Sequence, residues 1–200
     1  SLNVDREAIF VGGHSAGGHL SALVASDPRY LNARRLTLAD VAGALPIGGT
    51  YDIPDYRAAL RAGDTSLAET HISAVFGDER AGWEDASPTE YLSRSNVPML
   101  VVVEDQKGFQ RYAKRLKKAA RRARRDNITF LDAKNRTHGN VLLLMSGRHA
   151  DEVRAQMLAF MRDNRAEAFR NRTTQIESSA TRMQQSSLRT SARSAPREAS

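Results

Sequence analysis

Four short runs of apolar residues recur along the first two thirds of the chain, and each is followed by a turn signal or a polar residue. Continuous apolar runs of this length are typical of strands in a parallel sheet that is covered on both faces. The third run contains no polar side chain and is the clearest of the four. We predict buried strands at residues Ala8–Val11, Val41–Ile47, Pro98–Val103 and Ile128–Leu131.

Between these runs the apolar residues return at helical spacing. One helix is predicted from Ser15 to about Ser26, where Asp27-Pro28 ends it. A long helix follows the third strand, with an apolar stripe on one side and basic residues on the other. The last helix, over about residues 150–162, is predicted from the spacing of Val153, Met157, Phe160 and Met161.

The region 55–95 differs from the rest because it contains several short helical segments and no strand pattern. Tyr56, Ala59 and Leu60 indicate one helix, and Ser87-Pro88 has the proline expected at a helix start. Such an excursion between strands of an α/β enzyme commonly forms a lid or the wall of a pocket.

Strands and helices therefore alternate, which predicts the α/β class with a mostly parallel sheet and helices on both faces. We place this domain at residues 1–163. Residues 164–200 are rich in Ser, Thr, Arg and Gln, and we expect this tail to be disordered because it has too little apolar surface to bury.

Composition limits the chemistry further. The 200 residues include no cysteine, which excludes disulfides, thiolate metal sites and cysteine nucleophiles. No apolar run approaches the roughly 18 residues of a membrane span, so no membrane partner is expected. The net charge of +7 is uneven: residues 111–125 carry +9, residues 165–200 carry +4, and the remainder carries −6. The basic helix has few interleaved aromatic residues, so a solvated face is favoured over nucleic-acid binding.

The turn after the first strand carries the sequence Gly13-His14-Ser15-Ala16-Gly17. This G-x-S-x-G pattern is typical of a nucleophile elbow, in which a sharp turn between strand and helix exposes a serine. The turn strains the backbone of the serine and tolerates only small neighbours, which Gly13 and Gly17 provide. The alternative is an ordinary glycine-rich turn with a capping serine.

A serine hydroxyl needs a base to take its proton, and a loop after the fourth strand offers His138. Asp105 follows the third strand and would orient that histidine. Three alternatives stay open: Glu104 is the acid and Asp105 a helix cap, both acids are surface residues, or His138 is a solvated loop histidine. Carboxyl ends of parallel strands meet at one edge of the sheet, so Ser15, Asp105 and His138 are expected together. The backbone N–H of Ala16 would be one oxyanion donor.

The other histidines suggest no metal centre. His14 and His19 are five residues apart, which is the wrong spacing for a two-histidine site on a helix, and we interpret both as structural. His71 and His149 have no partner pattern. We therefore predict neither a metal nor a cofactor.

With these residues in place, the chain resembles the α/β-hydrolase superfamily, in particular its esterase/lipase branch with kynurenine formamidase-like and feruloyl-esterase-like members. The resemblance covers about residues 3–163. It implies a serine hydrolase that needs no cofactor and acts on a small-molecule ester or amide, with Ser15 as nucleophile, Asp105 as acid, His138 as base and Ala16 as an oxyanion donor. It is carried by residues 13–20, Gly48-Gly49-Thr50-Tyr51-Asp52, Ser87-Pro88, Pro98–Asp105 and Arg136-Thr137-His138.

The sequence departs from the family pattern in two places. Family members have further strands before the elbow and a His-Gly-Gly loop that completes the oxyanion hole, so we expect this chain to be the C-terminal portion of a hydrolase. The strand at 8–11 would then be an exposed edge through which the chain could self-associate. The alternative function is an impaired hydrolase fragment that serves as an interaction module. The acid region also reads Val103-Glu104-Asp105-Gln106, without the glycine that is usual before the aspartate, which leaves the choice between Glu104 and Asp105 open.

Overall fold

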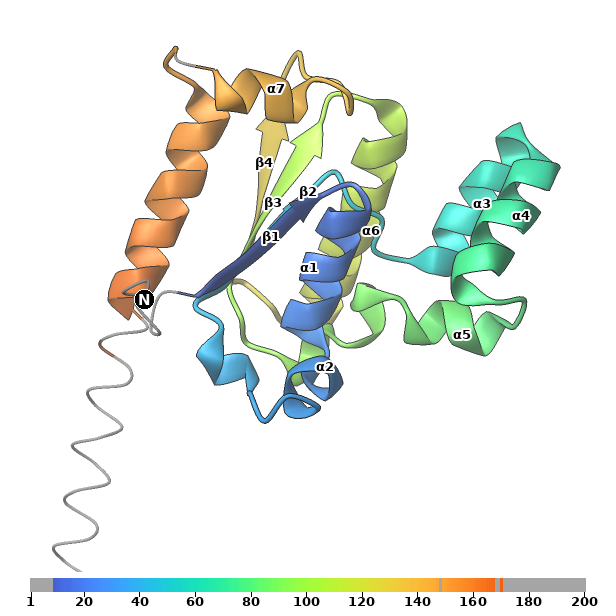
Figure 1. Cartoon of the computed structure of the whole chain (residues 1–200), viewed down its shortest axis with the longest axis horizontal. Coiled ribbons are helices and arrows are strands. Elements are labelled where there is room, and N and C mark those ends of the chain that lie inside the picture. The colour runs from blue at the N-terminus through green and yellow to red at the C-terminus, as the bar shows by residue number, and fades with distance from the viewer. Residues whose placement is uncertain (1–8, 148, 168–169, 171–200) are drawn as a thin grey trace, which may run out of the picture.

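The computed structural model describes residues 9–147, 149–167 and 170, and places a four-stranded parallel sheet at its centre (Figure 1). The strands lie in the order β1-β2-β3-β4, so each is a neighbour of the next strand in the sequence. Their bounds are β1 Phe10–His14, β2 Gly43–Ile47, β3 Met99–Glu104 and β4 Ile128–Ala133. The α/β class and the parallel sheet predicted from the apolar runs are thereby confirmed.

Helices fill the connections between the strands, as a parallel sheet requires. The helices are α1 Ala16–Ser26, α2 Pro28–Asn32, α3 Ile53–Gly63, α4 Thr65–Phe76, α5 Arg80–Asp85, α6 Lys107–Arg122 and α7 Val141–Ser146, and a final helix spans 152–167. Short 3₁₀ turns occur at Leu38–Asp40, Pro88–Glu90 and Leu92–Arg94. None of the helices in the described part of the chain is long and apolar enough to cross a membrane.

The predicted elements differ from the observed ones mainly at their ends. β1 continues through His14, further than the expected end at Val11, and Ala8 lies outside the described residues. The final helix runs to 167, past the expected domain end at 163, whereas 171–200 lies outside the described residues. Helix α7 was not predicted, because Val141–Met145 is a continuous apolar run without helical spacing.

The two faces of the sheet are covered by different helices, because successive side chains of a strand point to opposite faces. On β3, Val101 and Val103 belong to the apolar cluster shared with α1 and α6, which includes Ala22 and Leu116. Val102 points the other way, into a second cluster with α7 and the final helix. Residues of one strand thus hold both layers of helices.

Helices α3 and α4 project to the side of the sheet, next to α6 (Figure 1). They are tied to α6 by Asp55, whose buried carboxylate accepts hydrogen bonds from Arg111 at 2.8 and 3.0 Å and from Arg115 at 2.8 Å. Burial opposes the ionisation of Asp55, but the two guanidinium groups outweigh it and lower its pKa. Part of the basic face of α6 therefore pairs within the domain.

Arg125 lies just beyond α6 and is 7% exposed. Its guanidinium donates to the backbone carbonyls of Leu92, Ser95 and Val97 at 3.0, 2.5 and 2.6 Å. Burial lowers the pKa of this arginine. These bonds give donors to carbonyl groups of the segment that leads into β3, one of which, that of Leu92, also accepts from the N–H of Ser95.

We expect Arg125→Met to lower the free energy of unfolding by about 2–4 kcal/mol, because three backbone carbonyls lose their donor. Urea unfolding followed by circular dichroism measures this loss. The matched control is Arg121→Met, which removes an exposed arginine of α6 and should change stability by about 0.5 kcal/mol or less. Equal free energies of unfolding in the two variants would contradict the stabilising role of Arg125.

Candidate active site

The first turn after β1 has the geometry of a nucleophile elbow. Ser15 stands between β1 and α1 with φ 60° and ψ −118°, a strained conformation for a residue with a side chain. Its backbone N–H donates to the carbonyl of Ile47 at 2.9 Å, which fixes the turn against the end of β2. The strain is therefore held by the neighbouring strand.

Glycine is required at two positions around this turn. A Cβ on Gly13 would lie 2.6 Å from the backbone of Gly17, and a Cβ on Gly18 would lie 2.5 Å from the carbonyl oxygen of Ile47. The expected need for a small residue at Gly17 is wrong, because a Cβ there would meet nothing within 4 Å. Close packing of α1 against β1 and β2 accounts for Gly13 and Gly18.

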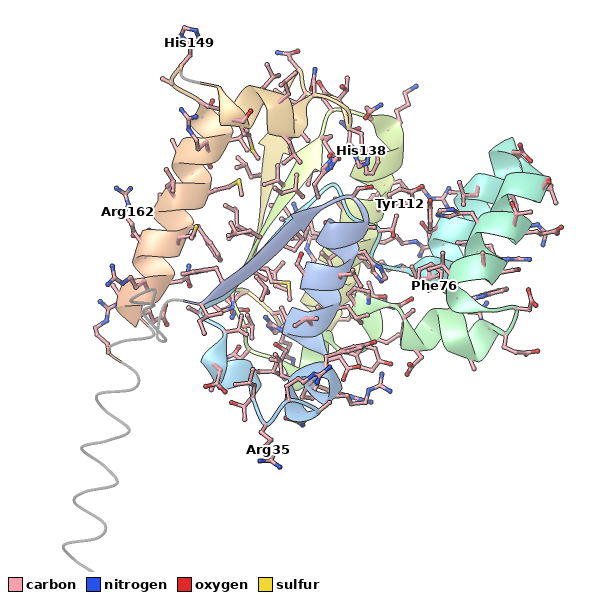
Figure 2. The ribbon with its side chains drawn as sticks, in the orientation of Figure 1. Arg35, Phe76, Tyr112, His138, His149 and Arg162 are labelled. Carbon is pink, nitrogen blue, oxygen red and sulfur yellow. The ribbon has the colours of Figure 1, made fainter. Side chains whose placement is uncertain are left out.

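His138 reaches the serine from the loop between β4 and α7. Its Nε2 lies 2.9 Å from Ser15 Oγ, a hydrogen-bond distance. The backbone N–H of His138 donates to Gln106 Oε1 at 2.6 Å, and the N–H of Asp105 donates to the carbonyl of Arg136 at 2.8 Å. The loop is thus tied to the end of β3. Figure 2 shows His138 above the carboxyl ends of the strands, beside the start of α6.

The carboxylate next to His138 belongs to Glu104 rather than to Asp105, which corrects our placement of Asp105 beside the base. Glu104 Oε1 lies 3.1 Å from His138 Nδ1, and the Glu104 side chain is fully buried. Asp105 is exposed, and its carboxylate accepts from Gln110 Nε2 and from the N–H of Asn135, both at 3.2 Å. Asp105 therefore holds the loop and does not contact the imidazole.

Side chains along a strand alternate between the two faces of the sheet, which explains why Glu104 rather than Asp105 reaches His138. β3 extends to Glu104, so Glu104 points to the same side of the sheet as Val102, which faces α7 and the final helix. The loop that carries His138 leads into α7 on that side. Asp105 comes one residue later, where the strand has ended, and its side chain is directed outward.

Gly48, at the end of β2, provides the space for this carboxylate. Its φ is +54°, and a Cβ on it would lie 2.0 Å from Glu104 Oε1 and 2.3 Å from Oε2. The buried acid thus occupies the place where a side chain on Gly48 would stand. Only the Gly48-Gly49 pair at the strand exit signals this in the sequence.

Two further rings contact His138. The ring of His14 lies 4.3 Å from it at an interplanar angle of 35°, and the ring of Phe109 stacks on it at 4.2 Å and 12°. The interpretation of His14 as merely structural did not anticipate this position. Phe109 was predicted only as part of the apolar stripe of α6, where it stands in the first turn.

His19 and Tyr51 lie behind the elbow and are buried. Nε2 of His19 lies 2.7 Å from the carbonyl of Ala86, which fits its expected structural role; burial lowers its pKa, and this hydrogen bond acts in the opposite direction. Tyr51 accepts from the N–H of Gly49 at 3.2 Å. Burial raises the pKa of its phenol, the bond from Gly49 lowers it, and the charge of Glu104 raises it further.

Among the described residues, His14, Glu104 and His138 form a group of metal-ligand type, with ligand atoms all within 4.8 Å of one another. The two imidazoles pack against each other at 4.3 Å with a tilt of 35°, whereas the ligands of a tetrahedral site converge on one point from different directions. His138 also contacts Ser15 with one nitrogen and Glu104 with the other. The arrangement suits proton transfer better than metal binding.

Such a hydroxyl–imidazole–carboxylate chain can activate the serine oxygen as a nucleophile. Ala16 begins α1 directly after Ser15, so its backbone N–H is among those without a partner inside the helix. This N–H lies at the positive end of the helix dipole, where it can stabilise a negative charge that forms next to the serine.

Comparisons with known proteins agree with this architecture. A scan against protein-family models finds no match, and a search of curated proteins finds no significant relative. Among solved structures, esterase B from Lactobacillus rhamnosis matches 84% of this chain with a TM-score of 0.65 and 13% identity. A truncated carbohydrate esterase from gut microbiota matches 82% with a TM-score of 0.63 and 18% identity, and an acylaminoacyl peptidase matches 68% with a TM-score of 0.54 and 16% identity.

The chain spans only part of the length of these proteins. The matched region is 57% of the Lactobacillus esterase, 62% of the carbohydrate esterase and 21% of the peptidase. The proteins share the parallel sheet with its covering helices, and their identities are low enough that the likeness concerns the fold. This chain has the α/β-hydrolase fold, the fold of these esterases and peptidases.

Proposed function

We propose that this chain is the catalytic portion of a serine hydrolase that cleaves carboxylic esters, with amides as the second substrate class, through an acyl-enzyme. The observation that carries the proposal is the 2.9 Å contact between Ser15 Oγ and His138 Nε2, with a buried glutamate on the other ring nitrogen. The described structural neighbours include esterases and peptidases, which supports hydrolysis of an acyl group.

In the proposed reaction, Ser15 Oγ attacks the carbonyl carbon of the ester and His138 Nε2 takes its proton. Glu104 stabilises the imidazolium and holds the ring in the orientation that the transfer needs. The tetrahedral intermediate places its oxyanion near the N–H of Ala16. The imidazolium then protonates the leaving alcohol, and water attacks the acyl-enzyme with His138 again as base.

Ser15→Ala should abolish labelling by a fluorophosphonate probe, because the probe forms a covalent bond with an activated serine. Gel fluorescence of the full chain measures the labelling, with Ser21→Ala on the buried side of α1 as a control that keeps it. Labelling that persists in Ser15→Ala would contradict the nucleophile. A folded wild-type chain that neither labels nor hydrolyses an ester would favour the alternative, an interaction module.

The acid can be tested by comparing Glu104→Gln with Asp105→Asn. We expect Glu104→Gln to lower kcat for p-nitrophenyl acetate by about 10³–10⁴-fold, because the imidazolium loses its counter-charge. Asp105→Asn should stay within about tenfold of wild type, since it weakens only hydrogen bonds of the loop. A larger loss in Asp105→Asn than in Glu104→Gln would overturn the assignment.

Gly48→Ala tests the role of Glu104 without changing Glu104 itself. Its Cβ would occupy the position of the Glu104 oxygens, so the acid must leave His138, and we expect kcat to fall about 10²-fold or more. Gly77→Ala is the matched control: φ of Gly77 is +74° and its Cβ would meet nothing within 4 Å. Both variants should lose stability from the strained φ, by about 1–2 kcal/mol. Equal kcat in the two variants would contradict the idea that the missing side chain of Gly48 makes room for the Glu104 carboxylate.

A further inference from the structure

Glu104 faces a second imidazole besides that of His138. His14 Nε2 lies 3.3 Å from Glu104 Oε1, the same oxygen that His138 Nδ1 approaches to 3.1 Å. Within the described part of the chain, His14 Nε2 is buried and makes no well-aligned hydrogen bond, although this contact is within ion-pair distance. One carboxylate oxygen is therefore shared between two histidines.

Two rings also pack against the imidazole of His138, that of His14 tilted by 35° and that of Phe109 stacked. His14 and Phe109 both lie against the ring of His138, at centroid distances of 4.3 and 4.2 Å. Two rings at such distances cannot share one face of an imidazole, so they cover opposite faces. The imidazole of His138 is held edge-on between Ser15 and Glu104 and face-on between His14 and Phe109.

The charge state of His14 thus bears directly on the Ser15–His138 contact. When neutral with its proton on Nε2, His14 can donate to Glu104 and hold the carboxylate in place. When protonated, it competes with His138 for the same negative charge and repels the imidazolium that forms during catalysis. Either state changes how well Glu104 stabilises His138.

We propose that His14 is a positioning residue that shares Glu104 with His138 and couples the protonation of the two imidazoles. The expected effect of His14 on the rate rests on the proposed function. The expected coupling of the two imidazoles rests only on their geometry. His14 acts through Glu104 and His138 and does not approach the hydroxyl. The acid side of the activity profile should then contain two proton steps, because two imidazoles that share one carboxylate titrate as a coupled pair.

The other charged and titratable groups on the elements around the cluster are carboxyl, phenol, amine and guanidinium groups, whose ordinary pKa values differ from that of histidine. They are Tyr51 from the loop after β2, Asp105 and Lys107 at the end of β3 and start of α6, and the ion pair of Arg136 in the His138 loop with Asp151 before the final helix. Between pH 5 and 8, histidine is the side chain that ordinarily gains or loses its charge. The two imidazoles are therefore the groups that determine the expected profile.

The coupling is measured on the full chain by NMR, from the pH dependence of the imidazole signals of wild type, His14→Gln and the control His149→Gln, an exposed histidine. We expect His14 and His138 to titrate together in wild type, each curve showing two inflections. His138 should titrate in a single step in His14→Gln, whereas His149→Gln should behave as wild type. A single step for His138 in wild type would overturn the proposal, whether or not the protein is active.

Kinetics provide the second readout. The acid limb of kcat/KM should show two proton steps in wild type and one in His14→Gln, which keeps a donor for Glu104. His14→Phe keeps a ring against His138 but has no donor, so kcat should fall about tenfold with KM nearly unchanged. Equal kcat in His14→Phe and wild type, with the same acid limb, would reject the positioning role. If the chain does not hydrolyse the ester but the two imidazoles still titrate together by NMR, the proposed function is rejected and the coupling is retained.

Discussion

The burial of one carboxylate, that of Glu104, is the constraint on which the rest of the site depends. A carboxylate removed from water is costly unless it finds partners. Here Oε1 lies 3.1 Å from the imidazole of His138 and 3.3 Å from that of His14, and Oε2 has no hydrogen-bond partner among the described residues. The space for it exists because Gly48 has no side chain, and the loop that brings His138 to it is tied to the end of β3 through Asp105. Acid, glycine and loop therefore form one unit, and a change in any of them alters the contact with Ser15.

The parallel sheet brings these parts together from distant positions in the chain. His14 pairs with Ile47, and Ile47 pairs with Val102, so the ends of β1, β2 and β3 lie side by side. Each functional side chain stands at or just beyond such an end, where backbone hydrogen bonding of the sheet stops and loops begin. The strained backbone of Ser15 is held in the same way, by a hydrogen bond from its N–H to the carbonyl of Ile47. A rigid sheet edge thus provides the precision that a loop alone would lack.

The basic residues that dominate the net charge contribute to this architecture from the opposite side of the sheet. Arg111 and Arg115 bind the buried Asp55 and so attach α3 to α6, whereas Arg125 binds three carbonyl groups before β3. The first turn of the same helix α6 brings Phe109 onto the ring of His138. A helix whose basic side was expected to be a solvated face therefore has several internal roles, and its Phe109 reaches the candidate active site.

The sequence by itself determined the class of fold, the elbow at Ser15 and the histidine that meets it, because apolar runs and glycine turns are local patterns that the chain keeps when it folds. It left the choice between Glu104 and Asp105 open, since neighbouring residues of a strand point to opposite sides and only the end of β3 decides which one is buried. It also missed α7, whose apolar run lacks helical spacing, and the approach of His14 and Phe109 to His138. Those contacts depend on how β1, α6 and the loop after β4 pack against one another, and residues this far apart in the chain carry no local signal of their meeting.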